Sequence, residues 1–375
     1  MNNTYVKNEI SVDELIDFLV NEIYPNYPQL MKLFNNDEEK VRGILKKNIK
    51  VIKRKSIHNE YGISAMYNVV TGEILIYSKE KIDIESLRNN NDLKHTIVHE
   101  TIHALLKRTL GINHYVTGCS SNGQCNKKII RGFFKDAFHL EGCDNVLKKL
   151  IAKKLFFMRI NDENIGDGIN EGFTVWLTEK LIGSKMSKDP YSFERTYIDT
   201  IERIKGEDSV LKFASGNYKE IADVLNMSEV DSLFFLKSID IASSEINRVN
   251  PENQDYETKH SMWLFDSFQT AAQEMFVDNF LIPEYVKKLE NDGVNCSTLE
   301  ALCYILSGFR GIYEMSKSDD EEAKPMCEKS YKKIERLLSK TFIKYSYIAV
   351  GDNFSVDEII CLYGIYDYIY GKIRC

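Results

Sequence analysis

The feature that most constrains this 375-residue chain is a pair of histidines in His99-Glu100-Thr101-Ile102-His103, inside an apolar stretch from residue 96 to residue 110. An α-helix turns about 100° per residue, so side chains four residues apart leave one face, one turn from each other. The neighbouring residues are mostly apolar, without glycine or proline before Gly111, which predicts a largely buried helix. Buried His and Glu side chains are costly unless they are paired or bind a metal ion. The segment therefore predicts a metal site on a helix.

The HExxH spacing suits one zinc ion. His99 and His103 supply two ligands of a tetrahedral site, and Glu100 between them points toward a metal-bound water molecule. Zinc lowers the pKa of bound water to about 7, and a neighbouring carboxylate can then accept its proton. The motif predicts a hydrolase with one Zn²⁺ ion as its cofactor.

A catalytic zinc ion has three protein ligands and one open position, so the motif lacks one ligand. The extended metzincin motif is excluded because Leu106 and Thr109 stand where it has glycine and histidine. His95 is excluded because the eight residues from it to His103 span about 12 Å of helix, too far for both to bind one ion with His99.

The leading third ligand is Glu171. It lies among apolar residues, where an unpaired carboxylate is costly, and Gly172 permits close approach of a neighbouring helix. The alternative is an acidic residue in the first turn of a helix capped by Asp167 or Asn170, a place that the helix dipole favours.

An HExxH helix followed by a second helix that opens Asn170-Glu171-Gly172 resembles the gluzincin metallopeptidases, the group to which thermolysin belongs. The resemblance covers these two helices and implies that Glu171 is the third zinc ligand of a zincin-like peptidase. Two departures stand out. The segment 104–170 is longer than the corresponding separation in thermolysin-like enzymes and implies an insertion. Val175 replaces an Asp that often follows the ligand Glu, so the outer partner of a ligand histidine must come from elsewhere.

An enzyme of this class also needs a donor that stabilises the oxyanion of its tetrahedral intermediate. The candidate donors are Arg310, Tyr313, Arg195, Tyr197 and His139. Their alternative role is that of amphipathic side chains at a helix surface or a loop end, in a chain that has 21 tyrosines. His139 and Glu141 are also the reserve metal ligands.

The remaining sequence predicts an α+β fold that is predominantly α. Strands are expected over 49–55, 63–70 and 73–77, the last two joined in a hairpin through Thr71-Gly72. Helices are expected over 1–40, 89–110, 146–158, 169–182, 197–204, 230–246, 262–280, 299–313 and 359–373. We therefore expect a zincin-like catalytic region with a small N-terminal β-sheet over residues 1–185, and an all-α C-terminal region over 186–375 that closes the cleft.

Composition limits the partners and the location. The net charge of −7 argues against nucleic acid, because phosphate binding needs a basic surface. No apolar run is long enough for a membrane span, and the N-terminus lacks the apolar segment of a signal peptide. A cytoplasmic location is expected, with export without such a signal as the alternative. Cys119 and Cys125 lack the spacing of a paired zinc site and are expected to be free thiols in a loop.

Together these features predict a zinc metallopeptidase that hydrolyses a peptide or protein substrate with Glu100 as general base; they do not indicate an oligomeric state. Two alternatives stay open. The zinc is structural and the chain is an inactive interaction scaffold, or the chain is a toxin- or effector-like protease with a single protein substrate. A fourth protein ligand would favour the first, and activity confined to one folded protein would favour the second.

Overall fold

The computed structural model describes residues 10–55, 65–68, 70–78, 81–106, 166–185, 190–215 and 218–246, together with separate positions between 261 and 291. The helices expected over 146–158, 299–313 and 359–373 lie outside these residues. The same holds for several candidate side chains, namely Cys119, Cys125, His139, Glu141, Arg310 and Tyr313.

The described part is mostly helical with a three-stranded sheet, which confirms a predominantly α, α+β architecture. Its helices are α1 (Val12–Phe18), α2 (Pro28–Lys32), α3 (Glu38–Asn48), α4 (Ile84–Asn89), α5 (Asn91–Leu106), α8 (Asp167–Ile182), α9 (Ser192–Lys205), α10 (Glu207–Ser215), α11 (Tyr218–Leu225) and α12 (Glu229–Ile246). Shorter helical turns are η1 (Leu19–Ile23), η2 (Tyr24–Asn26) and η4 (Val277–Leu281), and the strands are β1 (Val51–Lys55), β2 (Ala65–Asn68) and β3 (Glu73–Tyr77). None of the described helices is long and apolar enough to cross a membrane.

Contacts along the backbone divide the chain into two units, which we call unit 1 (residues 1–113 and 170–195) and unit 2 (residues 114–169 and 196–375). Both α8 and α9 therefore have residues in each unit. The expected division between residues 185 and 186 stays a prediction.

The first helices of unit 1 follow the predicted apolar spacing. Ser11 caps α1 in a capping box with Glu14, whose backbone N–H donates to the Ser11 hydroxyl at 3.2 Å. The apolar side chains expected on one face are all buried, namely Leu15, Phe18, Leu19 and Ile23. This face supplies part of the unit 1 core.

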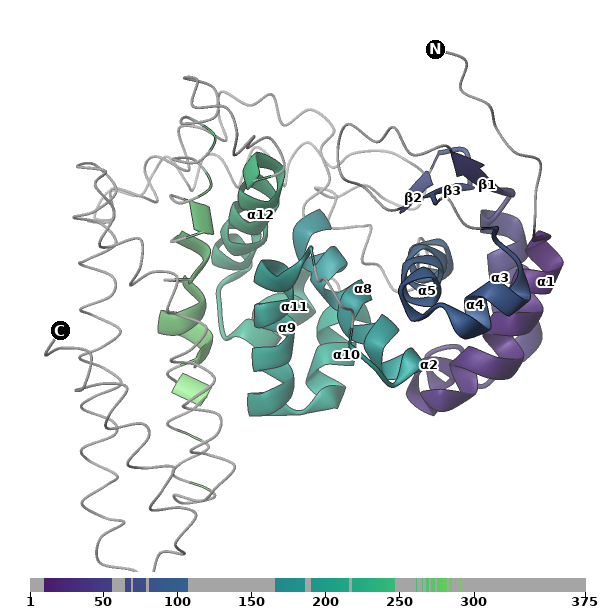
Figure 1. Ribbon diagram of the computed structural model, residues 1–375. Helices are drawn as coiled ribbons and strands as arrows, with labels where there is room; N and C mark the ends of the chain where they lie inside the picture. Colours follow the sequence, from purple (N-terminus) through teal and green to yellow (C-terminus); the bar gives the residue numbers. More distant parts are fainter. Residues whose placement is uncertain are drawn as a thin grey trace, which may run out of the picture. The chain divides into compact units, whose positions relative to one another are not determined.

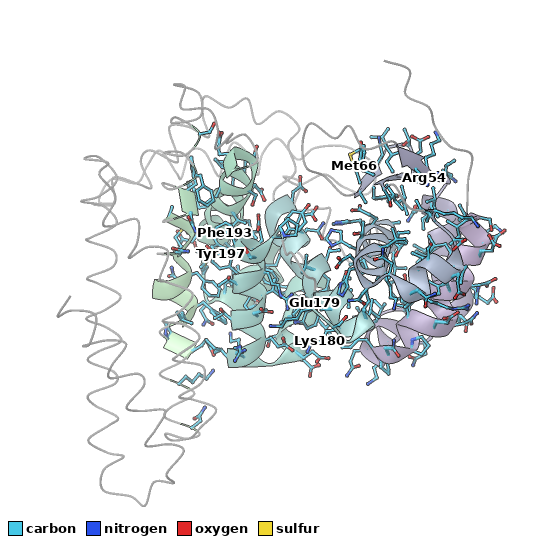
Figure 2. All side chains as sticks on the ribbon, in the orientation of Figure 1. Arg54, Met66, Glu179, Lys180, Phe193 and Tyr197 are labelled. Atoms are coloured by element: carbon cyan, nitrogen blue, oxygen red, sulfur yellow. The ribbon has the colours of Figure 1, made fainter. Side chains whose placement is uncertain are left out.

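The sheet of unit 1 has the strand order β1-β3-β2, and β2 pairs antiparallel with β3 as the predicted hairpin. Gly72 in the turn has a φ of 72°, where a side chain would meet the Asn48 carbonyl group. The parallel pairing of β1 with β3 was not predicted. β2 also contacts α5, which packs against α3 and α4 (Figure 1). Met66 on this outer strand is partly exposed (Figure 2).

Unit 2 contains a carboxylate that holds the start of α8. The two oxygens of Asp240, in α12, accept the backbone N–H groups of Gly166 at 2.8 Å and Gly168 at 2.9 Å. Burial raises the pKa of Asp240 to about 7, although Lys237 and the two N–H donors act in the opposite direction. The first turn of α8 is therefore capped by a residue from a helix much later in the chain, which sequence analysis did not anticipate.

Candidate metal centre

The HExxH motif lies in the C-terminal half of α5. The Asn90 side chain accepts the Leu93 backbone N–H at 3.0 Å and caps the first turn, as the asparagine-rich segment predicts. Both His99 and Glu100 are buried, with 5% and 8% of their surface exposed. The predicted helix is confirmed as far as Leu106, and residues 107–110 lie outside the described part.

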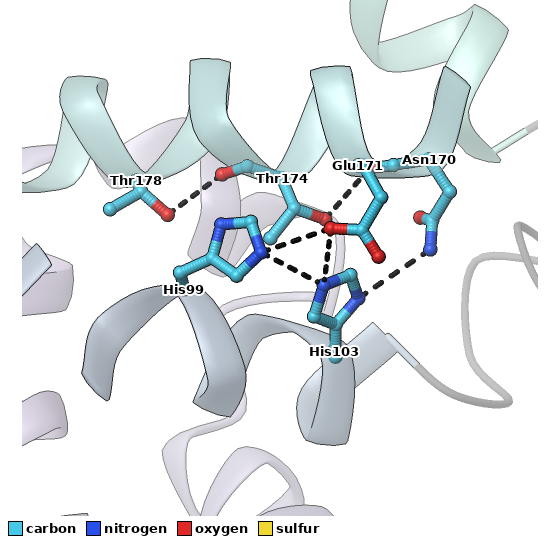
Figure 3. A network of polar contacts seen from close by, with 6 residues as sticks. All are labelled: His99, His103, Asn170, Glu171, Thr174 and Thr178. Carbon is cyan, nitrogen blue, oxygen red and sulfur yellow. Dashed lines mark hydrogen bonds and ion pairs between the residues drawn. The ribbon is translucent and has the colours of Figure 1, made fainter. Parts of the chain in front are cut away.

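Helices α5 and α8 run antiparallel, with the motif facing Glu171 between them (Figure 3). Near one end, the His95 ring nitrogen Nε2 lies 3.2 Å from the Ser184 hydroxyl. Near the other end, Nδ1 of His103 lies 3.5 Å from the side-chain amide of Asn170. The earlier residue of α5, His95, contacts the later residue Ser184, and the later residue His103 contacts the earlier residue Asn170, so the two helices run in opposite directions. His95 lies outside the group of possible metal ligands.

Three predicted ligands come together between the helices. Nε2 of His99 lies 3.1 Å from Oε2 of Glu171, Nε2 of His103 lies 3.2 Å from the same oxygen, and the two nitrogens are 3.1 Å apart (Figure 3). Ligands about 2.0–2.1 Å from a tetrahedral zinc ion lie about 3.3–3.4 Å from one another. The three side chains can therefore hold a metal ion, and their spacing is close to that of a zinc site.

Hydrogen bonding alone does not satisfy this cluster. The Glu171 oxygen accepts from both histidines only if each Nε2 carries a proton. The nitrogen–nitrogen contact of 3.1 Å would then have two donors and no acceptor. A cation between the three atoms removes this conflict, because each atom offers it a lone pair.

The surroundings of Glu171 favour the ionised form of its carboxylate. Its side chain is 28% exposed, and burial by itself would raise its pKa. The imidazoles of His103 and His99 outweigh burial and hold the pKa of Glu171 well below its usual range. The group is therefore ionised, as a metal ligand must be.

Glu100 points toward the sheet. Burial raises the pKa of its carboxyl group, and the nearby imidazoles of His99 and His103 oppose that rise. The backbone N–H of Tyr67, in the outer strand β2, donates a hydrogen bond to the Glu100 carboxylate. The candidate base therefore has a raised pKa and accepts a hydrogen bond from β2, which is at the edge of the sheet as far as the structure describes it.

The two histidine ligands have different second contacts. Asn170 lies beside Nδ1 of His103, where it could act as the outer partner that Val175 cannot supply. A half-turn of the amide presents its oxygen to an Nδ1 that carries a proton. In the described part of the chain, Nδ1 of His99 has no hydrogen-bond partner.

Tyr191 stacks on the imidazole of His99. This residue was not identified from the sequence. Its ring stacks on the His99 imidazole with a centroid separation of 5.7 Å and an interplanar angle of 3°. Its hydroxyl hydrogen-bonds Glu171, and burial together with the Glu171 and Glu100 carboxylates raises its pKa, so the hydroxyl keeps its proton. Because the chain has 21 tyrosines and this one lies beyond the helix that carries Glu171, no local spacing identifies it.

The start of α9 is held against α8 by Gly172, as the sequence predicts. A Cβ atom there would lie 2.6 Å from the Glu194 carbonyl carbon and 2.8 Å from the Arg195 nitrogen, so only glycine permits this approach. Farther along α8, Glu179 forms an ion pair with the Arg195 guanidinium at 2.5 Å. Arg195, a candidate oxyanion donor, is thus engaged in helix packing.

Another candidate donor, Tyr197, is buried in unit 2. Its ring packs edge-on against Phe235 and Phe276, with centroid separations of 5.2 and 5.1 Å. A role for Tyr197 in stabilising an oxyanion stays a prediction.

Comparisons with known proteins do not identify the chain: no family model, characterised protein or solved structure matches it. The inference of function therefore depends on the site itself.

Proposed function

We propose that the chain is a zinc-dependent metallopeptidase of the zincin type. The observation that carries this proposal is the convergence of His99, His103 and Glu171 at 3.1–3.2 Å from one another, with Glu100 next to His99. Two nitrogens and one carboxylate oxygen are the ligand set of many catalytic zinc sites.

The number of ligands supports catalysis over a structural ion. Among the described residues, the metal group has three members, whereas structural zinc sites close all four positions with protein ligands. A site with three protein ligands leaves one position for water or substrate. When bound, zinc supplies the Lewis acidity that makes water a nucleophile at neutral pH.

Glu100 is the proposed general base. Its carboxylate lies beside the candidate ligand histidines and is buried, and burial raises its pKa against the opposing effect of the two imidazoles. It would accept a proton from the attacking water molecule and pass that proton to the amine that leaves.

A peptide substrate is supported by the position of β2. Within the described sheet this strand is at the edge, and its Tyr67 N–H donates to Glu100. The outer edge of β2 and the base are therefore neighbours. An extended peptide can add to such an edge through backbone hydrogen bonds.

The test compares wild type with Glu100→Gln for zinc content and for cleavage of a peptide library. Both proteins should bind one zinc ion, and the variant should lose hydrolysis by about 10²–10⁴-fold. Glu85→Gln, an exposed change in α4, is the matched control and should alter neither property. Full hydrolysis by Glu100→Gln would overturn the mechanism. Zinc that is bound tightly without hydrolysis of any peptide would favour a structural ion.

A further inference from the structure

Tyr191 contacts two of the three proposed metal ligands at once. Its ring lies parallel to the imidazole of His99, and its hydroxyl hydrogen-bonds the carboxylate of Glu171. The two side chains come from different helices, α5 and α8, so Tyr191 contacts one proposed ligand from each helix.

The contact with His99 matters because that histidine lacks the hydrogen-bonded support that His103 has. Asn170 lies beside Nδ1 of His103, whereas Nδ1 of His99 has no hydrogen-bond partner in the described part of the chain. A second contact normally sets the orientation of a ligand imidazole. At His99, stacking by Tyr191 provides the corresponding restraint.

The backbone around Tyr191 is itself held in place. Its carbonyl accepts the Arg195 N–H at 2.8 Å, in the first hydrogen bond of α9. The close approach at Gly172 and the ion pair between Arg195 and Glu179 fasten the start of α9 to α8. Tyr191 therefore reaches the ligands from a fixed point and not from a freely moving loop end.

We propose that Tyr191 is a positioning residue that orients His99 and Glu171 before the metal ion binds. The inference rests on the proposed function only in that the site holds zinc. The hydroxyl donates to the Glu171 carboxylate without competing with it for the ion. The ring restricts rotation of His99, so less conformational freedom is lost when the ion is bound.

The test measures zinc affinity by competition with a chelator, and turnover of a cleaved peptide at saturating zinc. Tyr191→Phe keeps the ring and removes the hydroxyl, and should weaken zinc binding about 10-fold, whereas Tyr191→Leu removes both contacts and should weaken it about 100-fold. Turnover by Tyr191→Phe at saturating zinc should stay within about threefold of wild type, because the fully loaded site has its ligands in place. Tyr27→Phe, at a buried tyrosine whose ring packs edge-on against Trp176 of α8, is the matched control and should keep wild-type zinc affinity.

The outcomes separate this inference from the proposed function. Wild-type zinc affinity in Tyr191→Phe overturns the positioning role, and a large loss of turnover at saturating zinc with unchanged affinity would instead make Tyr191 a substrate contact. If wild type binds no zinc, both proposals fall. Thermal unfolding of the zinc-free variants near the wild-type temperature shows that the affinity changes do not come from misfolding.

Discussion

Glu171 in unit 1 and Asp240 in unit 2 are two partly buried carboxylates at α8: Glu171 belongs to this helix, and Asp240 caps its first turn. Asp240 accepts two neutral backbone N–H groups at the first turn of the helix, and burial raises its pKa to about 7. Glu171 lies against the imidazoles of His99 and His103, and its pKa is well below the usual range. Burial acts in the same direction on both, so the surroundings make the difference.

The comparison separates a structural carboxylate from a ligand. Neutral donors satisfy the oxygens of Asp240 but do not compensate the cost of its charge, and Lys237 reduces that cost only in part. The imidazoles around Glu171 do compensate it, and a bound cation would do so more strongly. A partly buried carboxylate that stays ionised is thus a better indication of a metal site than an acidic residue at a helix start.

The largest expected effect is on zinc binding by Glu171→Gln. This change removes the charged ligand and keeps its size, and should weaken zinc binding by several orders of magnitude, as measured by chelator competition. The matched change Asp240→Asn should leave zinc affinity unaltered. If Glu171→Gln still bound one equivalent of zinc, Glu171 would not differ from Asp240 in its effect on the metal, and His139 or Glu141 would become the third ligand.

The two carboxylates should also give the zinc-free protein opposite pH dependences. The pKa of Asp240 is raised, so its contribution to the free energy of unfolding is complete below 3.8 and is lost as pH rises through about 7. The pKa of Glu171 is lowered, so its contribution is present above 4.5 and is lost as pH falls below that value.

Asp240→Asn should flatten the decline in stability between pH 4 and pH 7, which for a single group is about 1.4 kcal/mol per pH unit at most. Urea denaturation of wild type and variant at several pH values measures the difference. Equal slopes in the two proteins would show that Asp240 does not titrate in this range.

A smaller effect is expected from two glycines one helical turn apart in α8, each close to one of the carboxylates. In Gly172→Ala the new methyl group meets the backbone at Glu194 and Arg195, which should cost about 1–3 kcal/mol of stability and also lower zinc affinity. In Gly168→Ala it meets the Ile239 methyl group and the Ser243 hydroxyl, both at 2.9 Å, and these side-chain atoms shift more readily than the backbone atoms that it meets at position 172. Chemical denaturation should therefore show the greater loss at position 172. The reverse order would indicate that α9 is not held tightly against α8.

The smallest expected effect is a gain in stability from Gly43→Ala. This variant measures the effect of helix propensity without crowding. Gly43 in α3 has open space where a side chain would be, with no atom within 4 Å of its Cβ position. Gly43→Ala should stabilise the protein by about 0.5–1 kcal/mol, because glycine loses more backbone freedom than alanine in a helix. If Gly43→Ala instead lowered the stability, a loss of stability in Gly168→Ala or Gly172→Ala could no longer be attributed to crowding by the new methyl group.

The parts of this structure that sequence predicts are local. The helical spacing of His99 and His103, the asparagine cap before α5 and the hairpin through Gly72 each depend on a few adjacent residues. Glu171 was predicted as the third ligand from a resemblance to gluzincin sites and because a carboxylate among apolar neighbours needs a partner. The predicted role of Gly172 in close packing is confirmed.

The parts that sequence missed depend on pairs of distant residues. Asp240 caps a helix that begins far before it in the chain, β1 pairs in parallel with β3 across the intervening hairpin, and the Tyr67 N–H reaches Glu100 through tertiary packing. Tyr191 belongs to the same class. Neither periodicity nor a short motif encodes such contacts, because many other asparagine, aspartate and tyrosine residues would satisfy the same local rules.

The separation between the two halves of the proposed metal centre also has a consequence for how the protein holds together. Its ligands lie on two helices that are far apart in the sequence, so a bound ion closes a long loop and acts as a removable cross-link. Binding to the folded state alone adds about 2.7 kcal/mol of stability at a free zinc concentration about 100 times the dissociation constant. The lifetime of the folded chain would then follow the supply of zinc around it, independently of any peptide that it cleaves.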